Sequence, residues 1–153
     1  MMQRHCDTHL DAAERLLGTP QQAASAWVSV FDAGALAVEK ARCYQQLGRP
    51  VQVRAETATA IASRTPDRVR SRAFAQLTAV SAMIDEGSLD EACSTASEVV
   101  DTTRLLGSRL AHRQLEELLP RFAPYAGNRD VAEFLDHLRD RLSDRYRKPR
   151  DVN

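Results

Sequence analysis

The sequence predicts an all-α fold in which antiparallel helix pairs stack into a solenoid. Glycine and proline are confined to a few short segments, and the stretches between them are rich in Ala, Leu, Glu, Arg and Gln, which favour helices. Apolar residues recur at helical spacing, and strand-like alternation is absent. A turn containing glycine recurs at Gly48, Gly87 and Gly127, at intervals of 39 and 40 residues. This period indicates a solenoid, because each helix-turn-helix unit has an apolar face that only the next unit can cover.

Seven or eight helices are expected, depending on whether the segment 20–30 forms one. The short turns between neighbours favour antiparallel pairs. The segment 67–86 is apolar on more than one face, which predicts a helix packed between neighbours. Three later segments each carry one apolar stripe: Leu89, Ala92, Cys93, Ala96, Val99 and Val100; Ala111, Leu115, Leu118 and Phe122; and Val131, Leu135, Leu138 and Leu142. In order, the predicted helices are 3–17, 20–30, 33–47, 50–64, 67–86, 88–105, 108–122 and 128–146.

Two turns share one layout, in "YQQLGRPVQV" (44–53) and "MIDEGSLDEA" (83–92). In each, a bulky residue lies four positions before the glycine, and we expect the glycine to end the first helix in the left-handed conformation. Ser88 and Glu91 have the spacing of a capping box, which predicts the start of the next helix. We therefore expect a single domain over residues 1–146, with helix pairs at 33–64, 67–105 and 108–146, an unpaired leading helix at 1–17 and a disordered tail at 147–153.

The composition excludes several classes of protein. Net charge is zero, so no global field favours nucleic acid or an anionic membrane. No segment is apolar enough to span a membrane, and the N-terminus lacks the apolar core of a secretory signal. The three cysteines are widely spaced and odd in number, which argues against a disulfide framework and favours a reducing compartment. We expect a cytoplasmic protein with no membrane association.

Candidate catalytic or metal-ligating residues are few. His5, Cys6 and His9 could share one helix face and hold a metal, but no second cluster completes such a site, so solvated helix residues are the preferred interpretation. Cys93 lies on an apolar stripe, which indicates a buried structural thiol. The arginine-rich segment "RTPDRVRSR" (64–72) could bind phosphate, but an acidic residue interrupts it and no aromatic residue is interleaved. We expect no catalytic residue, no metal and no cofactor, and hence a protein that is not an enzyme.

Two stretches carry a resemblance to known repeats. The segment "EGSLDEACSTASEVV" (86–100) is similar to the turn and second helix of a tetratricopeptide repeat (TPR). Over about residues 8–142, the chain resembles the C-terminal repeat region of actinobacterial helix-turn-helix (XRE-type) transcriptional regulators. The residues that carry this resemblance are Trp27, Phe31, Asp32, Cys43, Tyr44, Leu47, Gly48, Arg49, Pro50, Arg70, Arg72 and Ala73, together with the closing segment 120–142. The resemblance implies a TPR-like right-handed superhelix.

The resemblance also implies a function. Members of that family carry an N-terminal DNA-binding helix-turn-helix that this chain lacks, so we expect no direct DNA binding by this chain alone. A truncated product, a fragment and a stand-alone sensor are all open interpretations. In such repeats the first helix of each pair lines a concave groove, which here would present Val38, Arg42, Gln45, Gln46, Leu77, Ser81, Asp85, Gln114 and Glu117. This mixed polar surface suits a peptide or protein partner.

The function expected is therefore that of a non-catalytic protein-interaction or ligand-sensing module. The alternatives are a dimerisation scaffold without a ligand and, from another class, an uncharted enzyme or metal-binding protein. The leading helix carries an apolar stripe of Leu10, Ala13, Leu16 and Leu17, with no preceding helix to cover it. Exposed apolar surface at an uncapped solenoid end tends to find a partner, so we expect a homodimer that meets end to end.

Overall fold

The computed structural model describes residues 2–18, 32–106 and 109–147, which form seven α helices and a short 3₁₀ turn, with no strand in those ranges. This confirms the all-α prediction. The predicted helix at 20–30 and the tail beyond residue 147 lie outside the described residues. In order, the elements are α1 (Met2–Gly18), α2 (Ala33–Gln46), α3 (Pro50–Ala62), α4 (Val69–Glu86), α5 (Leu89–Leu106), α6 (Arg109–Phe122), η2 (Ala123–Tyr125) and α7 (Arg129–Arg147).

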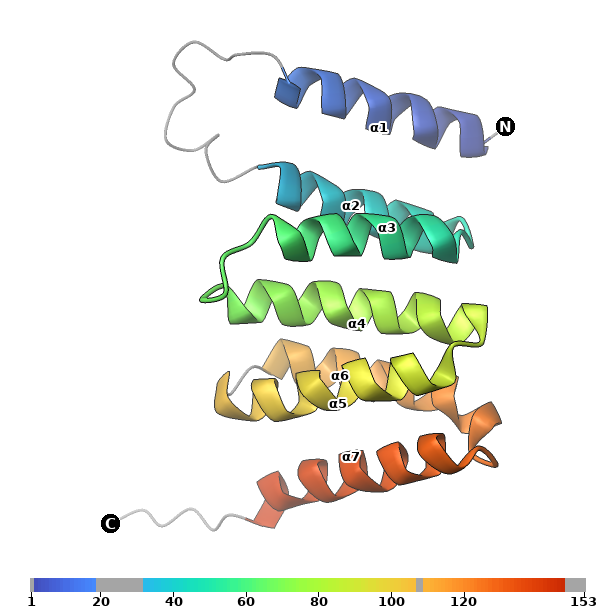
Figure 1. The fold of residues 1–153 in the computed structure, drawn as a ribbon, viewed down its shortest axis with the longest axis vertical. Coiled ribbons are helices and arrows are strands. Elements are labelled where there is room, and N and C mark those ends of the chain that lie inside the picture. The colour runs from blue at the N-terminus through green and yellow to red at the C-terminus, as the bar shows by residue number, and fades with distance from the viewer. Residues whose placement is uncertain (1, 19–31, 107–108, 148–153) are drawn as a thin grey trace.

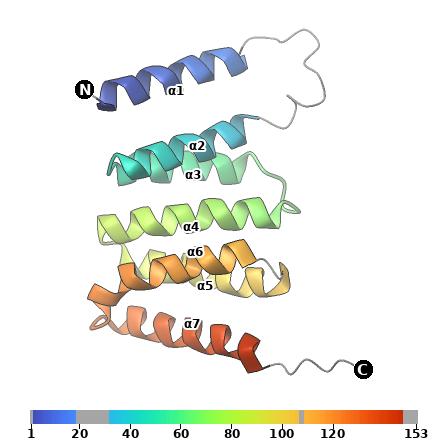
Figure 2. The ribbon, with the colours of Figure 1, turned by 180° about the vertical axis from the view of Figure 1, so that it is seen from behind.

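The helices lie across the long axis of the molecule, from α1 at one end to α7 at the other (Figure 1). Helix α2 packs against α3, α3 against α4, and α4 against α5. The last two helices are arranged differently, since α6 packs chiefly against α4 and α7 chiefly against α5, with little contact between α6 and α7. Seen from behind, α2 and α6 lie in front of α3 and α5 (Figure 2).

Local sequence explains where the helices begin and end. Asp32 caps α2 by accepting a hydrogen bond from the backbone N–H of Ala35 at 2.8 Å, and α3 begins with proline, which suits the first helical position. Gly48 and Gly87 have φ of 65° and 78°, as predicted for the two similar turns. The third turn differs, because η2 precedes α7 and the Asn128 side chain accepts hydrogen bonds from the first backbone N–H groups of that helix.

The apolar core divides into one large cluster and two small ones. The large cluster joins α4, α5, α6 and α7, and the rings of Phe122 and Phe134 within it lie 4.9 Å apart. The small clusters hold α2, α3 and α4 together, largely through alanine, which lets these helices approach closely. Close approach is tightest at Gly34, where an added Cβ would lie 2.2 Å from Ser63 Oγ. The second half of the chain therefore has the deeper core.

Charged side chains connect helix α1 to this stack. Lys40 of α2 lies 2.9 Å from Glu14 of α1 and 2.7 Å from Glu56 of α3, and Arg49 lies 3.0 Å from Asp7. Burial alone would lower the pKa of Lys40, but the hydrogen bonds and charges of its two glutamate partners outweigh it and raise that pKa above its ordinary value. The two carboxylates keep Lys40 charged at the junction of three helices.

Candidate binding groove

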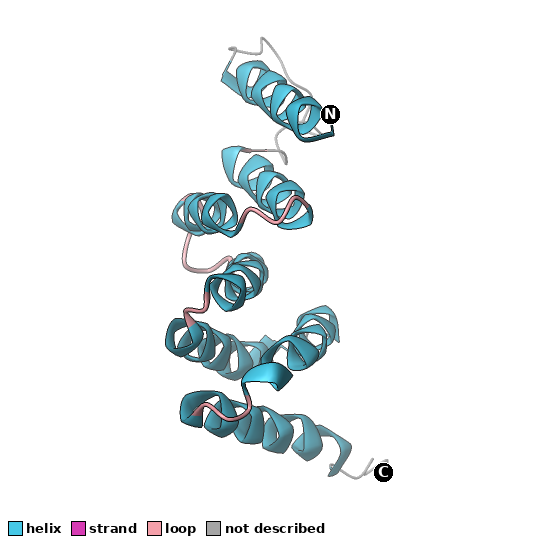
Figure 3. Cartoon of the chain, turned by 90° about the vertical axis from the view of Figure 1, so that its right-hand side faces the viewer, coloured by secondary structure: helices cyan, strands magenta, loops and turns pink. Residues whose placement is uncertain are grey.

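A groove runs along one side of the stack between α2 and α6, with α4 as its floor. From the side, α2 and α6 project in the same direction and α4 is set back between them (Figure 3). Two adjoining hollows occupy this groove. The upper hollow, between α2, α4 and the turn after α3, has a volume of about 620 Å³, and the lower hollow, between α4 and α6, has about 240 Å³. Both include Gln45, Thr78 and Gln114 in their linings, so they form one continuous depression.

Eight of the nine residues that the sequence analysis assigned to a groove line these hollows. Val38, Arg42 and Gln46 line the upper one, Leu77, Ser81 and Glu117 line the lower one, and Gln45 and Gln114 line both. The ninth residue, Asp85, does not line either hollow. It forms an ion pair with Arg121, which lines the lower one. The structure thus brings together residues from three helices that are far apart in the sequence.

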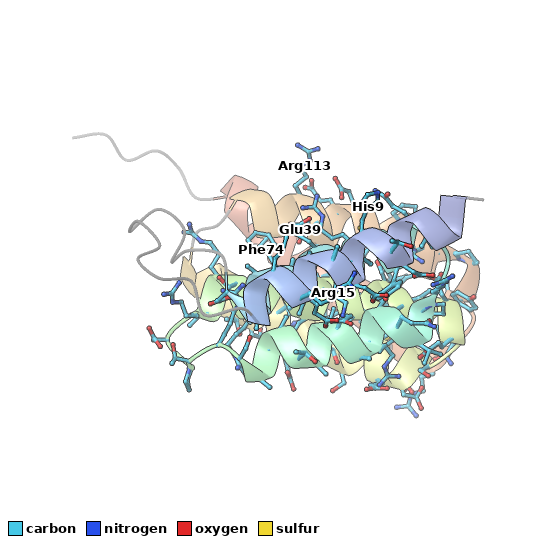
Figure 4. All side chains as sticks on the ribbon, turned by 90° about the horizontal axis from the view of Figure 1, so that it is seen from above. His9, Arg15, Glu39, Phe74 and Arg113 are labelled. Carbon is cyan, nitrogen blue, oxygen red and sulfur yellow. The ribbon has the colours of Figure 1, made fainter. Side chains whose placement is uncertain are left out.

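Six further lining residues were missed. Four of them, Ser71, Phe74, Thr78 and Leu118, lie on helices already expected to form the groove, whereas Arg64 comes from the turn after α3 and Arg121 from the end of α6. The stripe on α4 could have been extended, because residues 71, 74, 78, 81 and 85 follow one helical spacing. Viewed along the stack, Phe74, Glu39 and Arg113 lie on the α6 side, away from α3 (Figure 4).

The two ends of the groove differ in charge. Arg42 and Arg64 line the upper hollow, and none of the described residues in its lining is acidic. The nearest acidic partner of Arg42 is Glu39, 3.4 Å away on the same helix, and both side chains are largely exposed, so solvent weakens this pair. In the lower hollow, Glu117 pairs with Arg113 at 3.2 Å and Arg121 pairs with Asp85. The upper end is therefore cationic and the lower end is balanced.

Two polar atoms beside the hollows are buried without a hydrogen-bond partner among the described residues. They are Nε of Arg64, which lines the upper hollow, and Oε1 of Gln114, which lines both. An unpartnered buried polar group costs about 1–3 kcal/mol, so native proteins keep few of them and each calls for an explanation. Both side chains line the same depression.

The other candidate residues do not assemble into a reactive site. Cys93 is 6% exposed within the apolar core, and burial, with smaller contributions from Asp130 and Asp90, raises the pKa of its thiol to about 11. A thiol held protonated in this way is a poor nucleophile, which fits the structural role predicted for it. His9 is exposed on α1, and the side chains of His5 and Cys6 lie outside the described part of the chain. Within the side chains that are described, no three His, Cys, Asp or Glu residues are grouped to hold a metal.

The apolar stripe of α1 is only partly exposed. Leu10 was expected on an uncovered surface, but it is 9% exposed where α1 packs against α2. Leu16 is 66% exposed, and the side chain of Leu17 lies outside the described residues. The leading helix is therefore not unpaired, since it folds back onto α2 and leaves a smaller apolar surface than the sequence suggested.

Comparison with protein-family models, curated proteins and solved structures found no match. None of the helices in the described ranges combines the length and the apolar character that a membrane crossing requires.

Proposed function

We propose that this chain is a non-catalytic, TPR-like solenoid module that binds a peptide or an extended segment of a partner protein in the groove between α2, α4 and α6. The likeness of its sequence to the repeat region of XRE-type transcriptional regulators supports this proposal, as does the antiparallel packing of α2 on α3 and of α4 on α5. The observation that carries it is the pair of buried atoms, Arg64 Nε and Gln114 Oε1, which lack partners among the described residues beside one continuous depression.

The dimensions of the groove suit a short extended peptide. Its lining residues on α4 run from Ser71 to Ser81, a rise of about 15 Å at about 1.5 Å per residue. An extended chain advances about 3.4 Å per residue, so the groove accommodates about four residues. The amide and hydroxyl side chains along the groove can pair with a peptide backbone, and Val38, Phe74 and Leu77 provide apolar contacts for its side chains.

Selection from a library of random nonapeptides tests this function. The wild-type chain should enrich peptides that contact the groove. Thr78→Trp places a bulky neutral side chain where the two hollows join, so it should reduce capture of the enriched peptides by at least about tenfold. Thr59→Trp is the matched control, because Thr59 is exposed on α3 and lines neither hollow, and it should leave capture unchanged. Equal capture by the two variants, or no enrichment by the wild-type chain, would contradict the proposal.

A homodimer remains part of this proposal. Leu16 is exposed on α1, and no described residue of α1 lines either hollow, so a second copy that covers Leu16 is compatible with a peptide in the groove. A scaffold that only dimerises would form the dimer but would select no peptide that depends on the groove. The peptide selection therefore distinguishes the two functions.

A further inference from the structure

Helix α1 lies across one end of the stack, on α2, and its contacts there outline a binding surface apart from the groove (Figure 1). Asp7 accepts hydrogen bonds from Arg49 Nη1 at 3.0 Å and 3.3 Å. Glu14 accepts one from Lys40 Nζ at 2.9 Å. Leu10, between these two acids in the sequence, is 9% exposed. We call the surface of α2 and of the turn after it that receives these three residues the α1 seat.

The residues of α1 that meet the seat form a short helical pattern. Asp7, Leu10 and Glu14 are three and four positions apart, so they share one face over two helical turns. Asp11 and Arg15, by contrast, are exposed. The seat therefore recognises an acidic residue, a leucine three positions later and a second acidic residue after four more.

Both cations of the seat keep a partner within the stack when α1 leaves. Lys40 Nζ also lies 2.7 Å from Glu56 Oε1 of α3, and the guanidinium of Arg49 lies 5.9 Å from the ring centroid of Tyr44. The usual large penalty for breaking a buried ion pair, a buried charge left alone, is therefore avoided. The two acidic side chains of α1 are 41% and 57% exposed, and ion pairs so open to solvent are weak and screened by salt.

The covalent connection also permits α1 to leave. Fourteen residues, 19–32, join α1 to α2, and a chain of that length can span at most about 50 Å. This span exceeds the length of α1, about 26 Å, so the helix can clear the seat while α2 stays in place. Helix α1 is thus held by few contacts, all of which another helix could supply.

We propose that the α1 seat is a second binding site, which takes an amphipathic helix of a partner protein with the pattern Asp-x-x-Leu-x-x-x-Glu, and that α1 occupies it as a displaceable internal ligand. The acids of the partner helix pair with Arg49 and Lys40. A second copy of this chain is not the occupant, because its α1 has the same affinity as the helix already present, which is favoured by its covalent attachment. The site is independent of the groove, since no described residue of α1 lines either hollow.

Amide hydrogen exchange of the full chain tests how α1 is held. Asp7→Arg replaces attraction to Arg49 by repulsion, so exchange of the α1 amides should become at least about fivefold faster. Asp11→Arg is the matched control, because it reverses an exposed acid of the same helix that has no ion pair with a described residue, and it should leave exchange unchanged. Adding Arg49→Asp to Asp7→Arg restores the pair with its charges exchanged and should return the wild-type rate. Unchanged exchange in α4 shows that each variant is folded.

Peptides supplied in trans test whether the vacated seat binds another helix. The receptor is the full chain carrying both Asp7→Arg and Glu14→Arg, and the probe is an alanine-rich helical peptide that carries only Asp, Leu and Glu at the spacing of α1. In a nuclear magnetic resonance titration, the probe should shift the backbone amides of Lys40, Tyr44 and Arg49. A probe with both acids replaced by arginine should bind at least about tenfold more weakly. The wild-type chain should bind the acidic probe more weakly than the variant does, because its own α1 competes.

Several results would overturn the inference. Equal exchange in Asp7→Arg and Asp11→Arg, or no recovery on adding Arg49→Asp, would show that the ion pair does not hold α1. No shift at the seat, or equal binding of the acidic and arginine probes, would show that the vacated seat does not recognise the pattern. Probe binding that Thr78→Trp abolishes would place the helix in the groove. Self-association of the wild-type chain that the acidic probe reverses would assign the seat to a second copy.

Discussion

Gly87 ends α4, the floor of the groove, and the requirement of that turn for a left-handed residue can be tested directly. Its φ is 78°, in the left-handed region, and the next residue, Ser88, donates its N–H to the carbonyl of Met83 at 2.9 Å. An added Cβ would have no neighbouring described atom within 4 Å. The cost of Gly87→Val is therefore conformational and not steric.

The magnitude follows from the backbone. A residue with a Cβ pays about 1–2 kcal/mol in the left-handed region, and a β-branched residue pays at the upper end of that range. For a chain of this length, a loss of about 1 kcal/mol shifts the melting temperature by about 2–4 °C. Gly87→Val should therefore lower the unfolding free energy by about 2 kcal/mol and the melting temperature by about 4–8 °C.

The assay is thermal and urea unfolding followed by circular dichroism, with two controls. Gly87→Asn should recover most of the loss, because asparagine tolerates the left-handed conformation. Gly127→Val is the matched control, since Gly127 also has open space around its Cβ but lies outside the left-handed region, so its effect should stay within about 0.5 kcal/mol. An unchanged melt for Gly87→Val, or an equal loss for Gly127→Val, would refute the reasoning.

Four further predictions concern packing, ionisation, association and DNA. Gly34→Ala should destabilise the chain by about 1–3 kcal/mol because its Cβ meets Ser63 Oγ at 2.2 Å, and adding Ser63→Gly should restore stability in urea unfolding. The contribution of Cys93 to stability is complete below its unfolded pKa of about 9.0 and is lost as the pH rises through about 11. The difference in unfolding free energy between the wild-type chain and Cys93→Ala should therefore shrink over that pH range. A difference that stays constant with pH would contradict this prediction. Light scattering at tens of micromolar should show a homodimer that Leu16→Glu splits, and a monomer for the unmodified chain would reject the dimer. In gel retardation at physiological salt, this chain alone should show no sequence-dependent binding to duplex DNA, and retention that depends on sequence would be the contrary result.

Most helix boundaries could be predicted because they depend on local chemistry. The described helices start and end within about two residues of the expected positions, as is usual for boundaries inferred from caps and turns. The start of α4 at Val69, two residues late, is explained by the turn in which Arg68 donates its N–H to the carbonyl of Thr65. The capping box was a weaker guide, since Glu91 Oε1 accepts a hydrogen bond from Arg54 of α3 at 2.6 Å. At Glu91, a hydrogen bond between helices therefore competes with the local hydrogen bond of a capping box.

The packing of the last two helices could not be read from periodicity. The apolar stripes of α6 and α7 show that each helix has a buried face, but a stripe does not identify the helix that covers it. In the structure Leu115 and Leu118 of α6 and Leu135 and Leu138 of α7 join one cluster with α4 and α5. The predicted pair at 108–146 therefore closes over the preceding pair instead of packing mainly on itself.

Helical spacing predicts the walls of the groove, but it does not predict the charge of the groove. A helical stripe places Leu77, Ser81 and Gln114 on one side of their helices regardless of what surrounds them. Arg64 lies in a turn, where spacing says nothing about direction, and the sequence analysis considered it only as part of the segment 64–72, a disfavoured phosphate-binding candidate. Its position depends on Arg72, eight residues later, which holds the carbonyls of Ile61 and Arg64 with one nitrogen. The residue that gives the groove its cationic end is thus fixed by a tertiary contact, and its buried Nε carries the argument for a ligand that periodicity alone could not supply.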